Sequence, residues 1–455
     1  MSKAFFPRNF LKVYPQAARG EGCFIFTSEG KRYLDASGGA AVVTIGHGVE
    51  EVARAMAEQA RTLAYAHSSQ FESSVAEKLA RRILALVPPG MQGRGRVYFT
   101  SGGSEATETA LKLARQYWIE RGDNKRFRVV SRKQSYHGAT LGALSVSGNV
   151  RRREPFAPML AEWGHVVPCF CYRCPLGLTY PECNVDCADD LERLLEGDGS
   201  SDVAAFILES VAGATLGAVA PPDGYLQRIA EICRERGILL IADEVMSGMG
   251  RTGRPFAVDH WGVTPDMILF GKGIASGYAP LGGVIAAGHI AEAISGGSGA
   301  FLHGFTYNAH PVACAAGNAV LDYIERENLF AGVEPRGRDL RASLEPLKRF
   351  SIVGDVRGKG LLMAIEFVRD KATREPFPAD MHIASRIQED VLEAGVMTYP
   401  IQGCADGMRG DHILLAPPFT ITTPMIQTLA DALTRAIAEL ERTHLAGRGG
   451  VPAAH

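Results

Sequence analysis

A carboxylate and an amine follow two apolar segments in the middle of the chain. Ile238–Ala242 is an unbroken apolar run that ends at Asp243, and Met267–Phe270 is a second run with Lys272 two residues beyond it. Both runs have the length and composition of buried parallel strands. Because ligands of open α/β sheets bind beyond the carboxyl ends of the strands, we expect Asp243 and Lys272 to meet at one site. A lysine beside an acid in such a place indicates Schiff-base chemistry.

Taken alone, neither residue is diagnostic, since a lysine after a strand is usually solvated and an aspartate there is usually a cap or loop residue. The surrounding motifs are more specific: DEV at 243–245, a G-x-G-R-T-G loop, PDMILFGKG at 265–273 and a glycine-rich apolar strand. This series, part of a match from about residue 22 to 439, resembles the class III aminotransferases, which are pyridoxal-phosphate enzymes. Within that family it resembles the amine or omega-amino acid:pyruvate transaminases.

The resemblance assigns roles to residues of this central segment. It implies that Lys272 holds the cofactor as an internal aldimine and shuttles the substrate proton, while Asp243 pairs with the pyridine nitrogen. Val245 is expected to pack on the ring face opposite Tyr136. One departure follows DEV: many members of the family have glutamine there, and Met246 cannot donate its hydrogen bond to the phenolic oxygen of the cofactor.

The loop Gly248–Gly253 matches the dinucleotide pattern G-x-G-x-x-G, which suggests a nicotinamide oxidoreductase as an alternative. That pattern requires a strand before it and a helix after it. Here Pro255 and a polar run to His260 follow, without helical periodicity. We therefore reject a nicotinamide site on this loop.

A glycine turn at 101–105 lies between a predicted strand and a predicted helix. Free backbone N–H groups and the positive end of the helix dipole make such a turn an anion site, although ordinary βα turns share the pattern. The resemblance places the cofactor phosphate here. The family has asparagine and serine at the positions of Ser101 and Gly102, so one hydroxyl donor is lost. Gly103 and Ser104 are the expected phosphate contacts.

Three further segments contribute residues by resemblance. Tyr136 is expected to stack on the pyridine ring, with His137 next to it as a further cofactor contact. Glu209 ends a predicted strand and is expected to hold the polar network or a neighbouring arginine, although the family's Glu-Pro is Glu-Ser here. Thr306, in an H-G-x-T motif, is expected to reach the cofactor phosphate of the other subunit, which implies a homodimer or a larger assembly such as a tetramer.

Arg409 lies in a polar, glycine-rich loop at 404–411. Such loops can swing a side chain at low cost. In amine:pyruvate members of the family a mobile arginine has a similar place. We expect Arg409 to pair with the keto-acid carboxylate and to turn to solvent when an apolar amine binds. The alternative is a surface arginine paired with Asp406 or Asp411.

The predicted fold is α/β of fold type I. The resemblance implies a large cofactor-binding domain at 66–328, with a mostly parallel seven-stranded sheet flanked by helices. An N-terminal segment at 1–65 and a C-terminal domain at 329–455 are expected to form a smaller α+β lobe.

Composition excludes some classes of function. The 455 residues carry a net charge of −2, so no general attraction to nucleic acid or anionic membranes is expected. The first residues contain no apolar signal segment, and no run of 18 uncharged apolar residues occurs, which favours a cytoplasmic location.

Nine cysteines include a group of five in one segment. The C-x-C-x-x-C and C-x-x-x-C spacings of Cys169, Cys171, Cys174, Cys183 and Cys187 are compatible with a zinc loop. No histidine lies between them, and packed or free thiols are commoner in cytosolic enzymes. We expect no bound metal.

The predicted activity is transfer of an amino group from an amine or omega-amino acid to a keto acid such as pyruvate or 2-oxoglutarate. It would proceed by a ping-pong mechanism through the Lys272 aldimine. The alternatives on the same scaffold are an aminomutase, a decarboxylase and an epimerase. A non-catalytic relative is expected to have lost Lys272 or Asp243, and both are present.

Overall fold

The computed structural model describes residues 4–198 and 200–448. Its largest sheet contains the strands β4 (Arg96–Thr100), β5 (Arg128–Arg132), β6 (His165–Val166), β7 (Val203–Glu209), β8 (Leu239–Asp243), β9 (Met267–Phe270) and β10 (Gly282–Ala286). Their order is β4-β10-β9-β8-β7-β5-β6. All pairs from β9 to β6 are parallel, and β10 is antiparallel to both its neighbours. The prediction of a mostly parallel seven-stranded sheet is confirmed.

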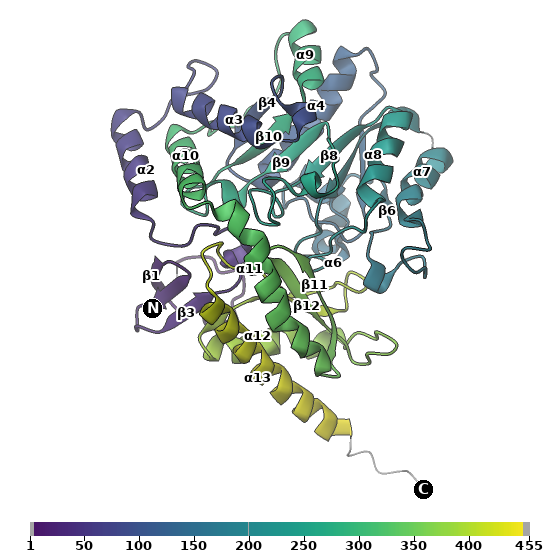
Figure 1. Cartoon of the computed structure of the whole chain (residues 1–455). Coiled ribbons are helices and arrows are strands. Elements are labelled where there is room, and N and C mark those ends of the chain that lie inside the picture. The colour runs from purple at the N-terminus through teal and green to yellow at the C-terminus, as the bar shows by residue number, and fades with distance from the viewer. Residues whose placement is uncertain (1–3, 199, 449–455) are drawn as a thin grey trace.

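Helices cover both faces of this sheet (Figure 1). Along β7, Ala205 and Ile207 belong to the core shared with α4 (Gly103–Glu120), whereas Phe206 and Leu208 belong to the core shared with α7 (Asp186–Asp198) and α8 (Tyr225–Arg236). Because both faces are covered, all residues of β7, β8, β9 and β10 are buried. This explains why these strands are continuous apolar runs rather than alternating ones.

Two smaller sheets lie below the large one in Figure 1. The first contains β1 (Ala17–Glu21), β2 (Phe24–Thr27), β3 (Arg32–Asp35) and β13 (Val396–Met397). The second is antiparallel, in the order β11 (Val353–Lys359), β12 (Leu362–Phe367), β15 (Asp411–Leu415) and β14 (Tyr399–Gln402). Parallel pairing of β3 with β13 joins the N-terminal and C-terminal segments. The helices α11 (Leu329–Leu344), α12 (Ile383–Glu393) and α13 (Thr423–Arg448) accompany these sheets.

The segment of the chain between β3 and β4, which lies wholly within the described residues, contains helices and no strand. It contains α2 (Glu50–Thr62) and α3 (Ser74–Leu86), which both pack against α10 (Pro311–Arg326). Helix α2 therefore contacts a helix of the predicted large domain at 66–328. The sequence prediction, by contrast, assigns α2 to the segment 1–65 of the small lobe. The three-part domain division stays a prediction.

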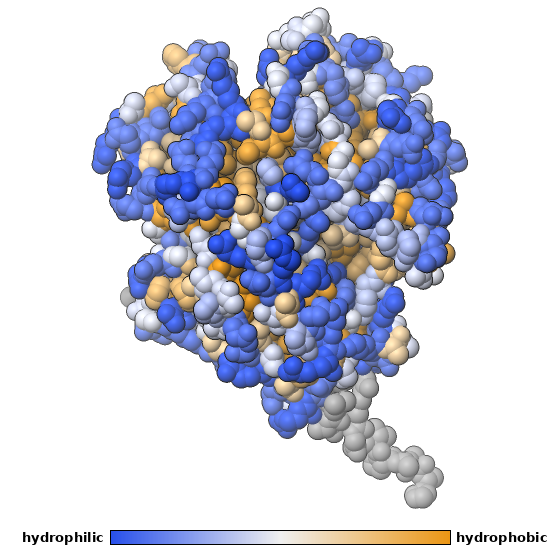
Figure 2. Space-filling view, in the orientation of Figure 1, coloured by the Kyte–Doolittle hydropathy of each residue, from blue (hydrophilic) through white to orange (hydrophobic). Residues whose placement is uncertain are grey.

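The surface shown in Figure 2 is mainly hydrophilic, and hydrophobic residues gather mostly in its hollows. Across residues 4–198 and 200–448, no helix combines the length and the apolar character needed to cross a membrane.

Candidate active site

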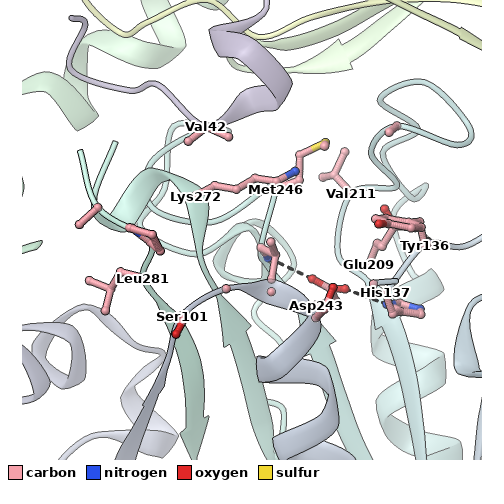
Figure 3. A pocket seen from close by; sticks show the side chains of 18 residues that line it. Val42, Ser101, Tyr136, His137, Glu209, Val211, Asp243, Met246, Lys272 and Leu281 are labelled. Atoms are coloured by element: carbon pink, nitrogen blue, oxygen red, sulfur yellow. Dashed lines mark hydrogen bonds and ion pairs between the residues drawn. The ribbon is translucent and has the colours of Figure 1, made fainter. Parts of the chain in front are cut away.

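A cavity of about 310 Å³ lies at the ends of β8 and β9, beside the loops that follow β4, β5 and β7 (Figure 3). Residues that were predicted from the sequence to form the site line this cavity, although they come from segments far apart in the chain. Those that line it are Gly103, Ser104, Tyr136, His137, Glu209, Asp243, Val245 and Lys272. The structure therefore places the predicted amine, carboxylates, aromatic ring and glycine turn around one space.

Lys272 directly follows β9 and Gly271, and its side chain extends across the cavity toward Met246 (Figure 3). Its φ of 46° lies in the left-handed region, which is uncommon for a residue other than glycine. Burial lowers the pKa of Lys272 to about 8, while the negative charges of Asp243 and Glu209 act in the opposite direction. A larger fraction of this amine is therefore uncharged, and nucleophilic, near neutral pH than in an exposed lysine.

Asp243, the last residue of β8, is buried with 6% of its surface exposed. Its Oδ2 lies 2.7 Å from Nδ1 of His137, and its Oδ1 accepts a hydrogen bond from the Val245 N–H at 3.0 Å. His137 is itself held at its backbone, because its N–H donates to Ser147 Oγ and its carbonyl accepts from Thr107 Oγ1. The carboxylate is thus fixed in direction before any ligand binds.

The glycine turn forms the start of α4, an 18-residue helix. The first N–H groups of a helix have no partner within it, and the helix dipole adds a partial positive charge. Ser104 Oγ accepts a hydrogen bond from the Ala139 N–H, so its own hydroxyl proton is free to be donated. A Cβ on Gly103 would come within 2.8 Å of the Val245 side chain, so a larger residue would not fit. This arrangement suits a phosphate group.

Glu209 and Tyr136 are linked on the side of the cavity opposite Lys272 (Figure 3). One carboxylate oxygen of Glu209 accepts from the Tyr136 N–H at 3.1 Å, and the other accepts from the Gly213 N–H at 2.7 Å. The Glu209 carbonyl accepts from Arg132 Nη2 at 2.6 Å. Burial raises the pKa of the Glu209 carboxyl. Glu209 therefore holds the loop that carries Tyr136 in place at the wall of the cavity.

These side chains fit pyridoxal phosphate in their chemistry. The start of α4 offers donors for the phosphate, Asp243 offers a carboxylate for the pyridine nitrogen, and Lys272 offers an amine with a lowered pKa for the aldehyde. Met246 lines the cavity, and its thioether has no N–H for the phenolic oxygen.

Two predicted residues lie outside the cavity of their own chain. Thr306 is exposed, and its carbonyl accepts a hydrogen bond from Tyr65 at 2.8 Å. Arg409 is also exposed; its Nε donates to Asp406 Oδ2 at 2.7 Å, and its Nη1 lies 3.6 Å from Glu375. The alternative to a substrate-binding role for Arg409 was a surface arginine paired with Asp406 or Asp411. The structure contains the first of these two pairs.

Other residues near the cavity were not predicted from the sequence. Arg132 is buried between the Glu209 carbonyl and Cys169 Sγ, which lies 3.3 Å from Nη1. Arg152 stacks over the Tyr136 ring. In the sequence, Arg132 and Arg152 are marked only as charged residues close to the Tyr136 motif.

The cysteine segment has no side-chain arrangement that calls for a metal. The nine cysteines are free thiols, and nowhere in the described ranges do three or more His, Cys, Asp or Glu side chains converge in a way that could hold a metal ion.

Known proteins are similar to this chain in both sequence and fold. The family model for class III aminotransferases matches residues 6–437. The uncharacterized aminotransferase YodT of Bacillus subtilis is 38% identical over 444 residues, which cover 97% of this chain and 99% of that protein. An amine transaminase structure from an uncultivated Pseudomonas species, in its pyridoxal-phosphate-bound form, is 38% identical with a TM-score of 0.90, covering 96% of this chain and 99% of the other.

A second solved structure is a thermostable (S)-enantioselective omega-transaminase from Thermomicrobium roseum. It is 38% identical with a TM-score of 0.89 and covers 96% of both chains. The chain therefore belongs to the class III aminotransferases, a family of pyridoxal-phosphate-dependent transaminases.

Proposed function

We propose that the enzyme transfers an amino group from an amine or omega-amino acid to a keto acid such as pyruvate or 2-oxoglutarate, in two successive half-reactions. The observation that carries this proposal is the pairing of Lys272, with its lowered pKa, and the fixed carboxylate of Asp243 across one cavity. Similarity to an amine transaminase and to an omega-transaminase supports an amine as donor.

The residues of the cavity divide the binding of pyridoxal phosphate between them. We assign the phosphate to the N–H groups at the start of α4 and to Ser104, and the two ring faces to Tyr136 and Val245. When bound, this cofactor supplies an aldehyde that joins the substrate nitrogen and a ring that accepts the electron pair left by the substrate proton. His137 acts through Asp243, whose orientation it fixes.

Proton movements follow from the two central side chains. Asp243 keeps a proton on the nitrogen that faces it, because a carboxylate stabilises the charged form of its partner. Lys272, once released by the incoming substrate, removes a proton from one carbon and returns it to the neighbouring one as a general base and acid. Its pKa of about 8 suits both roles near neutral pH.

We also propose a homodimer, or a tetramer as a larger assembly. Thr306 is exposed beside Leu302 and Tyr307, two large residues that are 83% and 61% exposed. A second copy covering this surface would bury them and bring Thr306 to the neighbouring site, where its hydroxyl serves the phosphate. The cytoplasmic location stays a prediction of the sequence.

Product analysis separates transfer from other reactions on this scaffold. The loaded enzyme is offered a panel of amines and amino acids, each with pyruvate or 2-oxoglutarate. Transfer consumes both partners and yields a carbonyl compound and a new amino acid in equal amounts. A decarboxylase would release carbon dioxide, and an aminomutase or epimerase would convert the donor without any acceptor. Either of those results would replace the proposed function.

A further inference from the structure

Three consecutive arginines, Arg151–Arg153, lie in the short helix α6 (Val150–Arg153) beside the cavity wall. Arg151 donates to a glutamine side chain, and Arg153 donates to two backbone carbonyls and a glutamate. The Arg152 side chain differs, since it has no hydrogen bond or ion pair to any residue in the described ranges. Its guanidinium donors are therefore available to a ligand.

Tyr136 holds Arg152 next to the cavity. The central guanidinium carbon lies 4.5 Å from the centroid of the Tyr136 ring, and that ring lines the cavity. A cation in this position is attracted electrostatically to the ring face. A contact with the ring uses none of the guanidinium N–H groups as hydrogen-bond donors to a side chain or carbonyl, so they remain available to a ligand. The backbone is also fixed, because the Arg152 N–H donates to Asn149 Oδ1 at 3.0 Å.

The charge of Arg152 is felt at the reacting amine. Burial is the main cause of the lowered Lys272 pKa, and the guanidinium groups of Arg251 and Arg152 both lower it further. Arg251 is buried, and its two terminal nitrogens donate to the backbone carbonyls of residues 43, 361 and 417. Of these two cations near Lys272, Arg251 is enclosed in the interior and bound at both terminal nitrogens, whereas Arg152 is half-buried and its side chain has no hydrogen bond within the described ranges.

We propose that Arg152 binds the carboxylate of the amino-acid and keto-acid substrates; this assignment rests on the proposed transfer reaction. Two parallel N–H groups of a guanidinium match the two oxygens of a carboxylate. Arg152 is half-buried, so it stays solvated and stacked on Tyr136 when an amine without a carboxylate is bound. One cavity can then accept both kinds of donor without leaving a buried charge unpaired.

Arg409 is the competing residue for this role. The loop at 403–410 lies against α6, since Gly407 packs near Val150. Arg409 already donates to Asp406, so it must give up this pair before it can reach a substrate. Arg152 has no such partner to give up. If Arg152 binds the carboxylate, Arg152→Gln should weaken carboxylate binding and Arg409→Gln should not. If Arg409 binds it, the reverse result is expected.

Arg152→Gln, Arg152→Lys, Arg409→Gln and the control Arg151→Gln are compared with the wild type, all loaded with cofactor. Calorimetry measures the Kd of propionate, an unreactive carboxylate. Rapid mixing measures the half-reaction with alanine and with benzylamine, which has no carboxylate. A wild type that converts neither amine would contradict the transfer reaction itself, and propionate binding would still report on Arg152.

We expect Arg152→Gln to weaken propionate binding and to raise the apparent Kd for alanine about tenfold or more, the effect of one charge-assisted pair. Benzylamine should react within twofold of the wild-type rate, Arg152→Lys should lie between, and Arg151→Gln should match the wild type. Propionate and alanine binding within twofold of wild type in Arg152→Gln would overturn the proposal. An equal loss with alanine and benzylamine would also overturn it, because it would indicate a structural role through Tyr136.

Discussion

His137 Nδ1 lies 2.7 Å from Oδ2 of Asp243, and both side chains are buried at the edge of the central sheet. The contact joins residues 106 positions apart in the sequence. Since Oδ1 of the same carboxylate accepts the Val245 N–H, Asp243 is held at both oxygens. We interpret this as preorganisation: the carboxylate is directed before the cofactor and the substrate arrive.

Asp243→Asn is expected to preserve the fold and to slow the first half-reaction at least a hundredfold, a loss of about 3 kcal/mol or more in transition-state stabilisation. The amide has the same shape but no charge to keep a proton on its partner. Stopped-flow mixing with an amine donor measures this step. A rate within a factor of about three of the wild type would show that another residue does this work.

His137→Leu is expected to slow the same step about tenfold, because one hydrogen bond to a charged group is lost. His137→Asn should recover most of this rate, since its amide nitrogen occupies the place of Nδ1. Stopped-flow rates and apparent Kd values for the two variants are compared. Equal losses in both would mean that the imidazole contributes more than the orientation of Asp243.

Lys272 should react as a free amine at unusually low pH. Burial lowers its pKa to about 8, so the amine is mostly protonated below that pH and mostly uncharged above it. In apoenzyme treated with an acylating reagent, modification of Lys272 should be half-maximal near pH 8. Exposed lysines, which ordinarily titrate near about 10.4, provide the comparison in the same mass spectra. Modification of Lys272 in parallel with them would contradict the lowered pKa.

Thr306→Ala should weaken retention of the cofactor about tenfold while leaving the assembly intact, because a hydroxyl donor to the neighbouring phosphate is lost. Thr306→Ser keeps the hydroxyl and serves as the control. Loss of cofactor during dialysis and sedimentation velocity give the two readouts. A fully active monomer would remove the shared-site argument.

Much of the fold follows from local sequence. The strand over Met267–Phe270 has the same bounds in the sequence prediction and in the structure, because an apolar run between polar and glycine residues specifies a buried strand. The meeting of Asp243 and Lys272 at one edge follows from parallel topology.

Contacts between distant segments could not be predicted in this way. The His137–Asp243 pair and the stacking of Arg152 on Tyr136 depend on how loops return to the sheet, and no local periodicity records this. Arg409 is a different case. The sequence predicts an arginine that moves between substrate and solvent, with a surface pair to Asp406 or Asp411 as the alternative, and in the structure its Nε donates to Asp406.

The central claim is that Lys272 and Asp243 serve a transfer of nitrogen in two separable steps. Loaded wild-type enzyme is mixed with an amine donor, freed of small molecules by gel filtration and then given pyruvate. We predict about one alanine per site from the wild type, since the nitrogen stays with the enzyme between steps, and under about one hundredth of that from Lys272→Ala, which lacks the proton carrier. Full alanine production by Lys272→Ala, or none from the wild type unless amine and pyruvate are present together, would contradict the account.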